Sequence, residues 1–261
     1  MSTTRAAPGR LLLIPNALDL GSEAVPLAEV LPQAVITRAA ALTHWVVEDA
    51  RSARAFLKRV QGLVPLSAPL QAMDIQELPR ARKGSGEAVP RAHWAALLAP
   101  VQTGADIGLL SEAGLPAVAD PGAELVASAH AAGITVEVLA GPSSLLMALA
   151  ASGLNGQSFA FLGYLPQDNS ARAGRVRESE TWSRRHNQTQ ICIETPYRNA
   201  ALWAALVATL SPTTRLSVSL GLTLKDALTQ TDSVAGWRAQ AAHQRMTLSD
   251  KTPAVFSWLA A

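Results

Sequence analysis

The sequence predicts an α/β protein of two domains, an N-terminal domain built on a parallel sheet and a C-terminal α/β domain with a mixed sheet. Short apolar segments alternate with longer helical patterns through the first half of the chain, which is typical of βαβ units. Two of the apolar segments run directly into turns rich in glycine and proline. The regular alternation stops after residue 141, so we place the domains at 10–140 and 141–261.

The alternation predicts each element of the first domain. Helices between successive strands imply a parallel sheet, and right-handed crossovers follow from it. Strands are expected at 11–14, 44–48, 106–110 and 135–139, with a weaker one within 70–78. Helices are expected at 25–40, 50–60, 91–102 and 123–132.

The second domain begins with a helix rich in Leu and Ala at 143–152, for which Ser143 is the expected N-cap and Gly153 the end. A second helix is expected at 200–210. Strands are expected at 159–164, 190–194, 216–220 and 253–259. The segment 168–188 is polar and basic and is interpreted as a basic surface loop.

Composition sets the broad class. The 261 residues are 49% hydrophobic and 16% charged, which is enough apolar material for a large core. The net charge of +2 does not by itself indicate a nucleic-acid binder. The single cysteine, Cys192, has no disulfide partner, which fits a reducing compartment. With no signal-peptide pattern and no run of about 20 apolar residues, we expect a soluble cytoplasmic protein without membrane contact.

The loop at 108–122 is the most informative stretch. An apolar strand enters a turn built from Gly, Pro and Asp, and ligands of open parallel sheets bind in such loops at the carboxyl ends of strands. Gly114 permits a backbone geometry closed to other residues, or the close approach of a ligand. Asp120 lies just ahead of the next helix, where it can cap free N–H groups.

Four segments together carry a family resemblance. They are the loop at 108–122, Leu-Ala-Gly-Pro-Ser-Ser at 139–144, Ile-Glu-Thr-Pro-Tyr-Arg-Asn at 193–199 and Val-Val-Glu-Asp-Ala-Arg at 46–51. In order and spacing they resemble the tetrapyrrole-methylase superfamily of S-adenosylmethionine (SAM) methyltransferases. The nearest branch is the ribosomal RNA small subunit methyltransferase I family, and the resemblance covers about residues 10 to 258.

Two departures from that branch indicate a divergent sister group. Its Asp-Ala-Gly-Thr-Pro loop is Glu-Ala-Gly-Leu-Pro at 112–116 here. Its Glu-Leu-Thr-Lys segment is replaced by Gly-Leu-Thr-Leu-Lys at 221–225. The cofactor scaffold is therefore expected to be kept, whereas the substrate-facing chemistry differs.

The resemblance implies that SAM lies folded in a cleft between the two domains. In the first domain the implied cofactor contacts are Leu18, Gly114, Leu115, Pro116 and Val118. In the second they are Ser143, Ser144, Glu194, Tyr197, Leu220, Gly221 and Pro253.

No compact catalytic signature is expected, because methyl transfer from a sulfonium depends mainly on alignment. Glu48, Asp49 and Arg51 follow a predicted strand, and they are either a helix start or a substrate-side cluster. Glu112 is a fourth candidate, able to address substrate or to order a water. No metal-ligand spacing, dinucleotide fingerprint or P-loop is present, so no metal is expected.

Two basic segments are candidates for phosphate contact, although such runs are usually solvated surface. They contain Arg80, Arg82 and Lys83, and Arg172, Arg175, Arg177, Arg184 and Arg185. The leading hypothesis is a methyltransferase acting on RNA, with 2′-O-ribose methylation of ribosomal RNA as the reaction that the resemblance implies. The alternatives are methylation of a tetrapyrrole or other small molecule, and a SAM- or RNA-binding module without turnover.

A homodimer is expected from the same resemblance. The helix at 200–210 is apolar on nearly every face, and Trp203 and Leu206 are expected to be exposed and to contribute to the contact.

Overall fold

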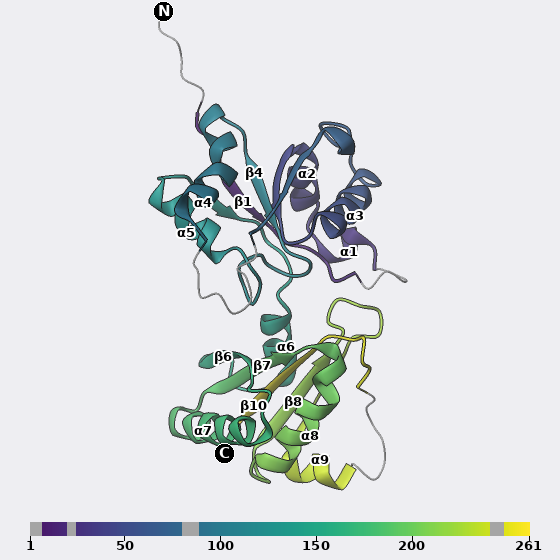
Figure 1. Ribbon diagram of the computed structural model, residues 1–261. Helices are drawn as coiled ribbons and strands as arrows, with labels where there is room; N and C mark the ends of the chain where they lie inside the picture. The colour runs from purple at the N-terminus through teal and green to yellow at the C-terminus, as the bar shows by residue number, and fades with distance from the viewer. Residues whose placement is uncertain (1–6, 20–24, 80–88, 241–247) are drawn as a thin grey trace, which may run out of the picture. The chain divides into compact units, whose positions relative to one another are not determined.

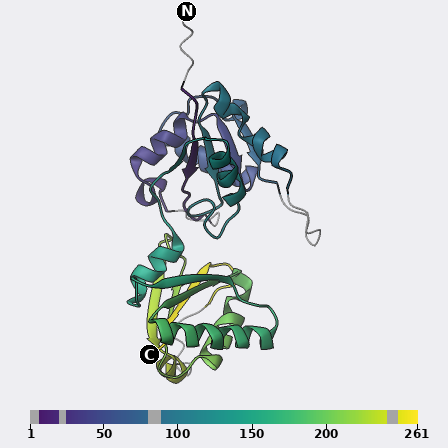
Figure 2. The same cartoon turned by 90° about the vertical axis from the view of Figure 1, so that its left-hand side faces the viewer.

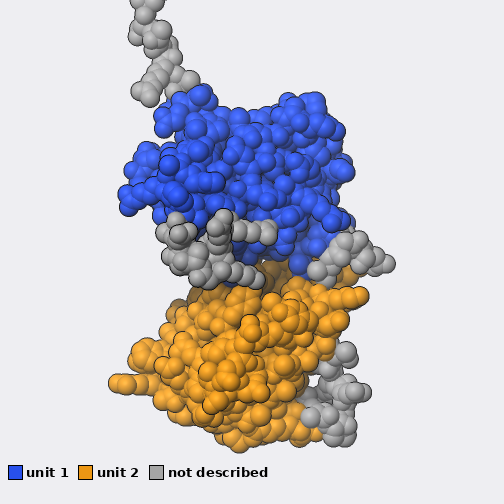
Figure 3. Space-filling view, viewed as in Figure 1, with its two compact units in different colours: residues 1–142 blue, residues 143–261 orange. Residues whose placement is uncertain are grey.

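The computed structural model describes residues 7–19, 25–79, 89–240 and 248–261. Contacts divide the chain into two compact units, residues 1–142 and 143–261 (Figure 3). Each unit has one five-stranded sheet with helices on both faces, which confirms the predicted α/β class. Within the described ranges, no helix is long and apolar enough to cross a membrane.

The sheet of the first unit has the order β3-β2-β4-β1-β5, and all its strands are parallel. They are β1 (Leu11–Ile14), β2 (His44–Val47), β3 (Asp74–Glu77), β4 (Ile107–Leu110) and β5 (Val136–Val138). Successive residues of β1 are buried on opposite faces, as the pleat of a strand requires. Both faces are therefore apolar, and each is covered by helices.

The helices of the first unit form two layers (Figure 1). One face of the sheet packs against α1 (Leu27–Val30), α2 (Gln33–Ala41) and α3 (Ala50–Gln61). The other packs against α4 (Arg91–Leu97), the 3-10 helix η2 (Ala99–Thr103) and α5 (Ala123–Ala131). A third short turn, η1 (Leu70–Ala72), precedes β3.

Two of the predicted helices are interrupted by proline. The segment expected as one helix at 25–40 is α1 followed by α2, because Pro32 is the N-cap of α2 and cannot continue the preceding helix. The helix expected at 91–102 ends at Leu97, and Pro100 lies in the 3-10 helix that follows it.

The sheet of the second unit has the order β6-β7-β10-β8-β9 and is mixed, since β6 pairs with β7 in parallel and the other pairs are antiparallel. Its strands are β6 (Phe159–Tyr164), β7 (Thr189–Glu194), β8 (Arg215–Leu220), β9 (Leu228–Ser233) and β10 (Ala254–Leu259). Strand β9 was not predicted, because its sequence Leu-Thr-Gln-Thr-Asp-Ser lacks apolar alternation.

Four α-helices cover the two faces of the second sheet (Figure 2). One face carries α7 (Asn169–His186), α8 (Asn199–Thr209) and α9 (Val234–Gln240), and the other carries α6 (Ser144–Ser152). The short 3-10 helix η3 (Pro196–Arg198) leads into α8.

The surface proposed for a homodimer contact was placed wrongly. Leu206 on α8 is fully buried, and Trp203 packs edge-to-face against Trp237 with ring centroids 4.9 Å apart. Trp237 belongs to α9, an element that the sequence did not predict and that covers this side of α8. The homodimer itself stays a prediction.

Candidate functional site

The connections of the first sheet diverge at the carboxyl ends of two neighbouring strands, a place that we call the crevice. Strands β1 and β4 are adjacent and parallel, so both end at the same edge of the sheet. The helices that follow β1 lie on one face, and the helix that follows β4 lies on the other. Ligands of open α/β sheets bind where the connections diverge in this way.

The loops that leave β1 and β4 are held together by Asn16. Its backbone and that of Gly114 form an isolated antiparallel bridge. Its side-chain nitrogen also donates to the carbonyl oxygens of Ser111 and Glu112, at 3.2 and 3.0 Å. Asn16 was not among the predicted site residues. The side-chain oxygen of this buried residue has no hydrogen-bond partner within the described part of the chain.

The loop after β4 has an unusual backbone. Gly114 and Gly122 have φ of +74° and +128°, and Ala117 and Ala119 have φ of +64° and +62°. Alanine rarely adopts the left-handed region, and residues held there often lie at ligand-binding sites. Ala117 and Ala119 therefore share the left-handed backbone that the sequence analysis considered only for Gly114.

Three carboxylates gather at the ends of β2 and β4. A carboxylate oxygen of Glu48 accepts the backbone N–H of Glu112 at 3.3 Å, and a carboxylate oxygen of Glu112 accepts the hydroxyl of Ser52 at 3.1 Å. Both negative charges act on Asp120, which also has a hydrogen bond from Ser111. We call Glu48, Glu112 and Asp120 the acidic cluster.

Asp120 does not cap the following helix, contrary to the prediction. The N-cap of α5 is Gly122, and no side chain caps that helix. Asp120 is instead half-buried beside Glu48 and Glu112, and burial first, then these two charges, raise its pKa from 3.8 to about 6. The hydrogen bond from Ser111 opposes the shift without cancelling it. Sequence reasoning missed this role because the burial of Asp120 and its approach to Glu48, which is distant in the chain, depend on the fold.

The structure separates the other predicted catalytic candidates. Asp49 is the N-cap of α3, and its carboxylate accepts the backbone N–H of Ser52 at 2.8 Å. Glu77 accepts the N–H of Ala50 at the same helix start. Arg51 is exposed, and no ion pair to it is formed within the described ranges. Asp49 therefore marks the start of a helix, which was the alternative to a place in a substrate-side cluster.

The first-unit residues implied to contact the cofactor lie in the two loops that Asn16 joins. Leu18 follows β1 and is half-buried, whereas Pro116 in the β4 loop is buried. Leu115 is half-buried, and the side chain of Val118 is 45% exposed. Residues 114–118 therefore lie at the crevice edge of this unit, and Leu115 and Val118 present apolar side chains there.

Within the second unit, a row of predicted residues lies at one end of the sheet. The register pairs Ala254 with both Glu194 and Leu220, so the ends of β7 and β8 lie beside Pro253. Gly221 has a φ of +55°, and its N–H donates to the carbonyl of Pro253 at 3.0 Å. Glu194, Leu220, Gly221 and Pro253 are thus neighbours, whereas their contact with the cofactor stays a prediction.

The buried Glu194 is held by several contacts. Its carboxylate pairs with Arg198 at 3.2 Å and accepts the N–H of Thr195 at 2.8 Å. Tyr197 is 72% exposed on η3. Asn199, which was not predicted, donates to the carbonyl of Thr252 and leaves its buried side-chain oxygen without a partner in the described ranges.

Ser143 and Ser144 begin α6. Ser143 is buried and occupies the N-cap position, as predicted. Its side chain makes no capping hydrogen bond to the helix. Leu145, the next residue but one, packs against Ile191 and Val255 of the sheet. The start of α6 is thereby fixed on the face of the sheet opposite to α7.

The described residues fit the cofactor that the resemblance implies. SAM has a cationic sulfonium, an amino group and ribose hydroxyls, all of which seek negative or accepting partners. Glu48, Glu112 and the unpartnered side-chain oxygen of Asn16 supply such partners in the first unit, and the unpartnered side-chain oxygen of Asn199 supplies one in the second. Among the described residues, no group of three or more His, Cys, Asp or Glu side chains is arranged to hold a metal.

The structure describes only the second of the two predicted basic segments. Arg80, Arg82 and Lys83 lie outside the described residues. The second segment is the helix α7 and not a loop, with Asp168 as its N-cap. Arg172 is buried against Asn169 and Gln167, so it is not available to phosphates. Four arginines of α7 are exposed, namely Arg175, Arg177, Arg184 and Arg185.

Several curated relatives of the chain are ribosomal RNA small subunit methyltransferases. The chain is 42% identical over 96 residues to the ribosomal RNA small subunit methyltransferase I of Vibrio cholerae, covering 37% of this chain and 32% of the relative. It is 37% identical over 139 residues to that of Mesorhizobium japonicum, covering 53% of this chain and 44% of the relative. The chain therefore spans less than half the length of these relatives.

Solved structures share the fold over nearly the whole chain. A uroporphyrin-III-C-methyltransferase from Thermus thermophilus has a TM-score of 0.50 at 18% identity, covering 96% of this chain and 94% of that one. A cobalamin synthesis related protein, CobF, from Corynebacterium diphtheriae has a TM-score of 0.57 at 14% identity, with coverage of 97% and 98%. At these identities the likeness concerns the fold alone.

One family model matches most of the chain. The model of the tetrapyrrole (corrin/porphyrin) methylases matches residues 33–235, which include β2 to β9 and hence most of both sheets. That family implies SAM as the methyl donor. The chain belongs to the tetrapyrrole methylase family.

Proposed function

We propose that this protein is a SAM-dependent methyltransferase acting on RNA, with 2′-O-ribose methylation of ribosomal RNA as its reaction. The observation that carries the proposal is the position of Asp120 at the crevice edge of the first sheet, with a pKa raised to about 6. The names of the curated relatives support RNA as the acceptor. The exposed arginines of α7 support a substrate that bears phosphates.

The chemistry divides between cofactor and protein. SAM supplies a methyl group that its sulfonium has already activated. The protein must align the acceptor hydroxyl and take its proton, since a ribose hydroxyl is a poorly acidic nucleophile. An ionised Asp120 can take that proton, and a pKa near 6 leaves it ionised at neutral pH yet more basic than an ordinary aspartate.

The neighbours of Asp120 have positioning roles in this proposal. Burial first, and then the negative charges of Glu48 and Glu112, keep the pKa of Asp120 high. Asn16 holds the backbone of the same loop in place. The left-handed residues between Gly114 and Gly122 give the loop the shape that returns Asp120 to the end of β4.

The residues that would hold the cofactor are those named from the resemblance. In the first unit they are Leu18 and residues 114–118, and in the second Ser143, Ser144, Glu194, Tyr197, Leu220, Gly221 and Pro253. A shared cofactor site predicts that substitutions in either set weaken SAM binding. The homodimer belongs to the same proposal and is tested by light scattering at micromolar concentration.

One experiment separates the proposal from its alternatives. Purified protein is incubated with methyl-labelled SAM and total RNA from a strain that lacks the gene, and the RNA is digested to nucleosides for mass spectrometry. We expect a labelled 2′-O-methylnucleoside. Label in a tetrapyrrole and not in RNA would establish the small-molecule alternative, and SAM binding by calorimetry without any transfer would establish a binding module.

A further inference from the structure

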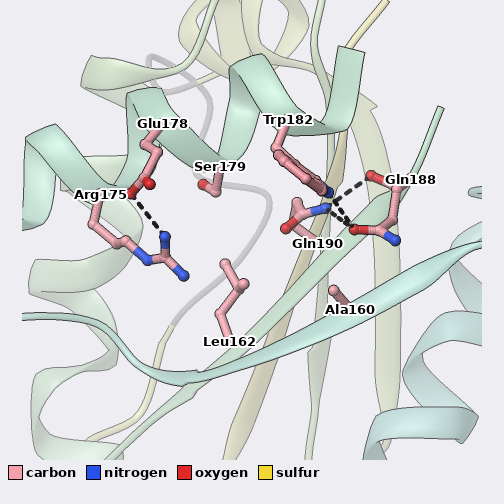
Figure 4. A pocket seen from close by; sticks show the side chains of 8 residues that line it. All are labelled: Ala160, Leu162, Arg175, Glu178, Ser179, Trp182, Gln188 and Gln190. Carbon is pink, nitrogen blue, oxygen red and sulfur yellow. Dashed lines mark hydrogen bonds and ion pairs between the residues drawn. The ribbon is translucent and has the colours of Figure 1, made fainter. Parts of the chain in front are cut away.

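A pocket of about 170 Å³ opens in the second unit between α7 and the edge strand β6 (Figure 4). It is distinct from the acidic cluster and from the residues implied to hold the cofactor. Its lining residues are Ala160, Leu162, Arg175, Glu178, Ser179, Trp182, Gln188 and Gln190.

Trp182 forms an aromatic wall of the pocket. Its side chain is 52% exposed, and one part of its ring system contacts His186, with centroids 4.1 Å apart and planes inclined by 33°. The indole N–H donates to the side-chain oxygen of Gln188 at 3.1 Å. The ring is thus oriented by protein contacts while about half of its surface stays open to a partner.

The two glutamines below Trp182 fix the polar end of the pocket. The side-chain nitrogen of Gln188 donates to Ser158, and that of Gln190 donates to the side-chain and backbone oxygens of Gln188. These bonds determine which way each amide faces. Gln190 is 2% exposed, and its oxygen lies on the side away from Gln188, where it can accept a hydrogen bond from a ligand (Figure 4).

The opposite end of the pocket is charged and its floor is apolar. Arg175 and Glu178 form an ion pair of 2.7 Å, which leaves other guanidinium nitrogens free to donate. Ala160 and Leu162 line the pocket from β6 (Figure 4). An aromatic wall, an apolar floor, an acceptor at one end and donors at the other suit a flat ring that carries both N–H and C=O groups.

We propose that this pocket binds one unpaired base of an RNA strand, stacked on Trp182, while Arg185 contacts a phosphate of the same strand. The volume favours a single ring system, since pockets for drug-sized ligands occupy about 300 Å³ or more. Arg185 lies three residues after Trp182, on the same side of α7, and no ion pair to it is formed among the described residues. The choice of RNA rests on the proposed function.

The test measures binding of a fluorescein-labelled, single-stranded 12-nucleotide RNA of mixed sequence to the full chain by anisotropy. We expect Trp182→Ala to weaken binding about 10- to 100-fold, as loss of one base–aromatic stack does, and Trp182→Phe to retain most of it. A perfect duplex of the same sequence is expected to bind more weakly, because its bases are not free to enter the pocket.

The arginines provide a matched pair of variants. Arg185→Ala is expected to weaken binding and to reduce the slope of log K against log salt by about one. Arg177→Ala removes the same charge from α7, but Arg177 lies five residues before Trp182 and is not its neighbour on the helix. Its effect on the affinity at fixed salt is expected to be smaller.

A further variant tests the pocket without removing the tryptophan. Ala160→Leu fills the pocket from the sheet side and is expected to weaken RNA binding as Trp182→Ala does. SAM affinity should be unchanged in all these variants. Equal RNA affinity of Trp182→Ala and wild type, or no affinity of wild type for single-stranded RNA, would overturn the proposal.

The same variants distinguish this proposal from the proposed function. If the protein binds RNA through Trp182 but transfers no methyl group to it, the base pocket stands and the methylation proposal fails. If wild type and Trp182→Ala methylate RNA with the same KM, methylation stands and the base pocket fails.

Discussion

Asn16 and Gly114 exchange two backbone hydrogen bonds, each 2.9 Å long, and so join the loop after β1 to the loop after β4. This link lies at the crevice between the two strands, next to the carbonyls of Ser111 and Glu112 that the Asn16 side chain also binds. The loop after β1 thereby holds the loop after β4, which carries Glu112 and Asp120 of the acidic cluster. Nearly 100 residues separate Asn16 from Ser111 in the chain.

Asn16→Ala is expected to destabilise the protein by about 1–3 kcal/mol, because two carbonyl oxygens lose their donor in a buried setting. Asn16→Asp should be worse, since a carboxylate cannot donate to those oxygens. Urea unfolding of the three proteins measures the difference. Thr37→Ala, at an exposed position of α2, is the control and should change stability little. An unchanged midpoint in Asn16→Ala would refute the role given to this side chain.

Gly114→Ala tests the cofactor site, with Gly133→Ala as its matched control. Both glycines have positive φ, +74° and +69°, so each substitution is expected to cost about 1 kcal/mol of stability. Only Gly114→Ala should weaken SAM binding in calorimetry, because Gly133 lies after α5 and away from the crevice loops. Equal SAM affinity in the two variants would remove Gly114 from the cofactor site. The left-handed φ also makes Gly114→Val a poor test of cofactor binding, because a β-branched residue there strains the fold.

Asp120→Asn is expected to lower kcat for RNA methylation by about 10²- to 10⁴-fold, which is the usual contribution of a general base. The affinity for SAM should change little. The control is Glu124→Gln, which removes an exposed carboxylate in the first turn of α5. A kcat of Asp120→Asn equal to that of wild type would exclude Asp120 as the base.

The pKa of Asp120 also predicts a pH dependence of stability. In the folded state its pKa is raised from 3.8 to about 6, so the folded protein keeps this proton to higher pH than the unfolded chain does. Stability is therefore lost as pH rises from about 4 to about 6, and the full cost persists above that range. Asp120→Asn should gain about 1 to 2 kcal/mol relative to wild type between pH 4 and pH 7.5, since partial exposure screens the charges. Urea unfolding at both pH values measures this, and a pH-independent difference would contradict it.

Local sequence pattern was sufficient for most strands and for the family. Strands β1, β2 and β4 are short apolar runs that end at polar or proline residues. The pattern of neighbouring residues was therefore enough to predict their bounds within one residue. The glycine-proline loops after β4 and β5 were recognisable because their chemistry depends on neighbouring residues in the chain. The same is true of Asp49, whose capping of α3 needs only the N–H of Ser52.

Helix α7 could not be predicted in this way. Its buried face includes Arg172, Ser179, Glu180 and Ser183, so the apolar periodicity that usually reveals a helix is missing. Partners elsewhere in the chain satisfy two of these groups, since Ser211 and Thr214 donate to Glu180 and the N–H of Ala260 donates to the hydroxyl of Ser183. A helix stabilised by such long-range hydrogen bonds looks like a solvated basic segment in the sequence.

The sequence by itself determined the α/β class, most strand positions, the family and the loops that line the crevice. Only the tertiary structure decided which groups surround Asp120 and which pocket Trp182 lines. The local sequence around Asp120 predicts a helix cap, but its pKa depends first on burial, then on Glu48, which follows the neighbouring strand β2, and on Glu112 of its own loop. Trp182 lines a pocket only because β6 runs past α7. Backbone preferences depend on adjacent residues, whereas charge interactions and cavities depend on distances in space that pairing of the strands sets.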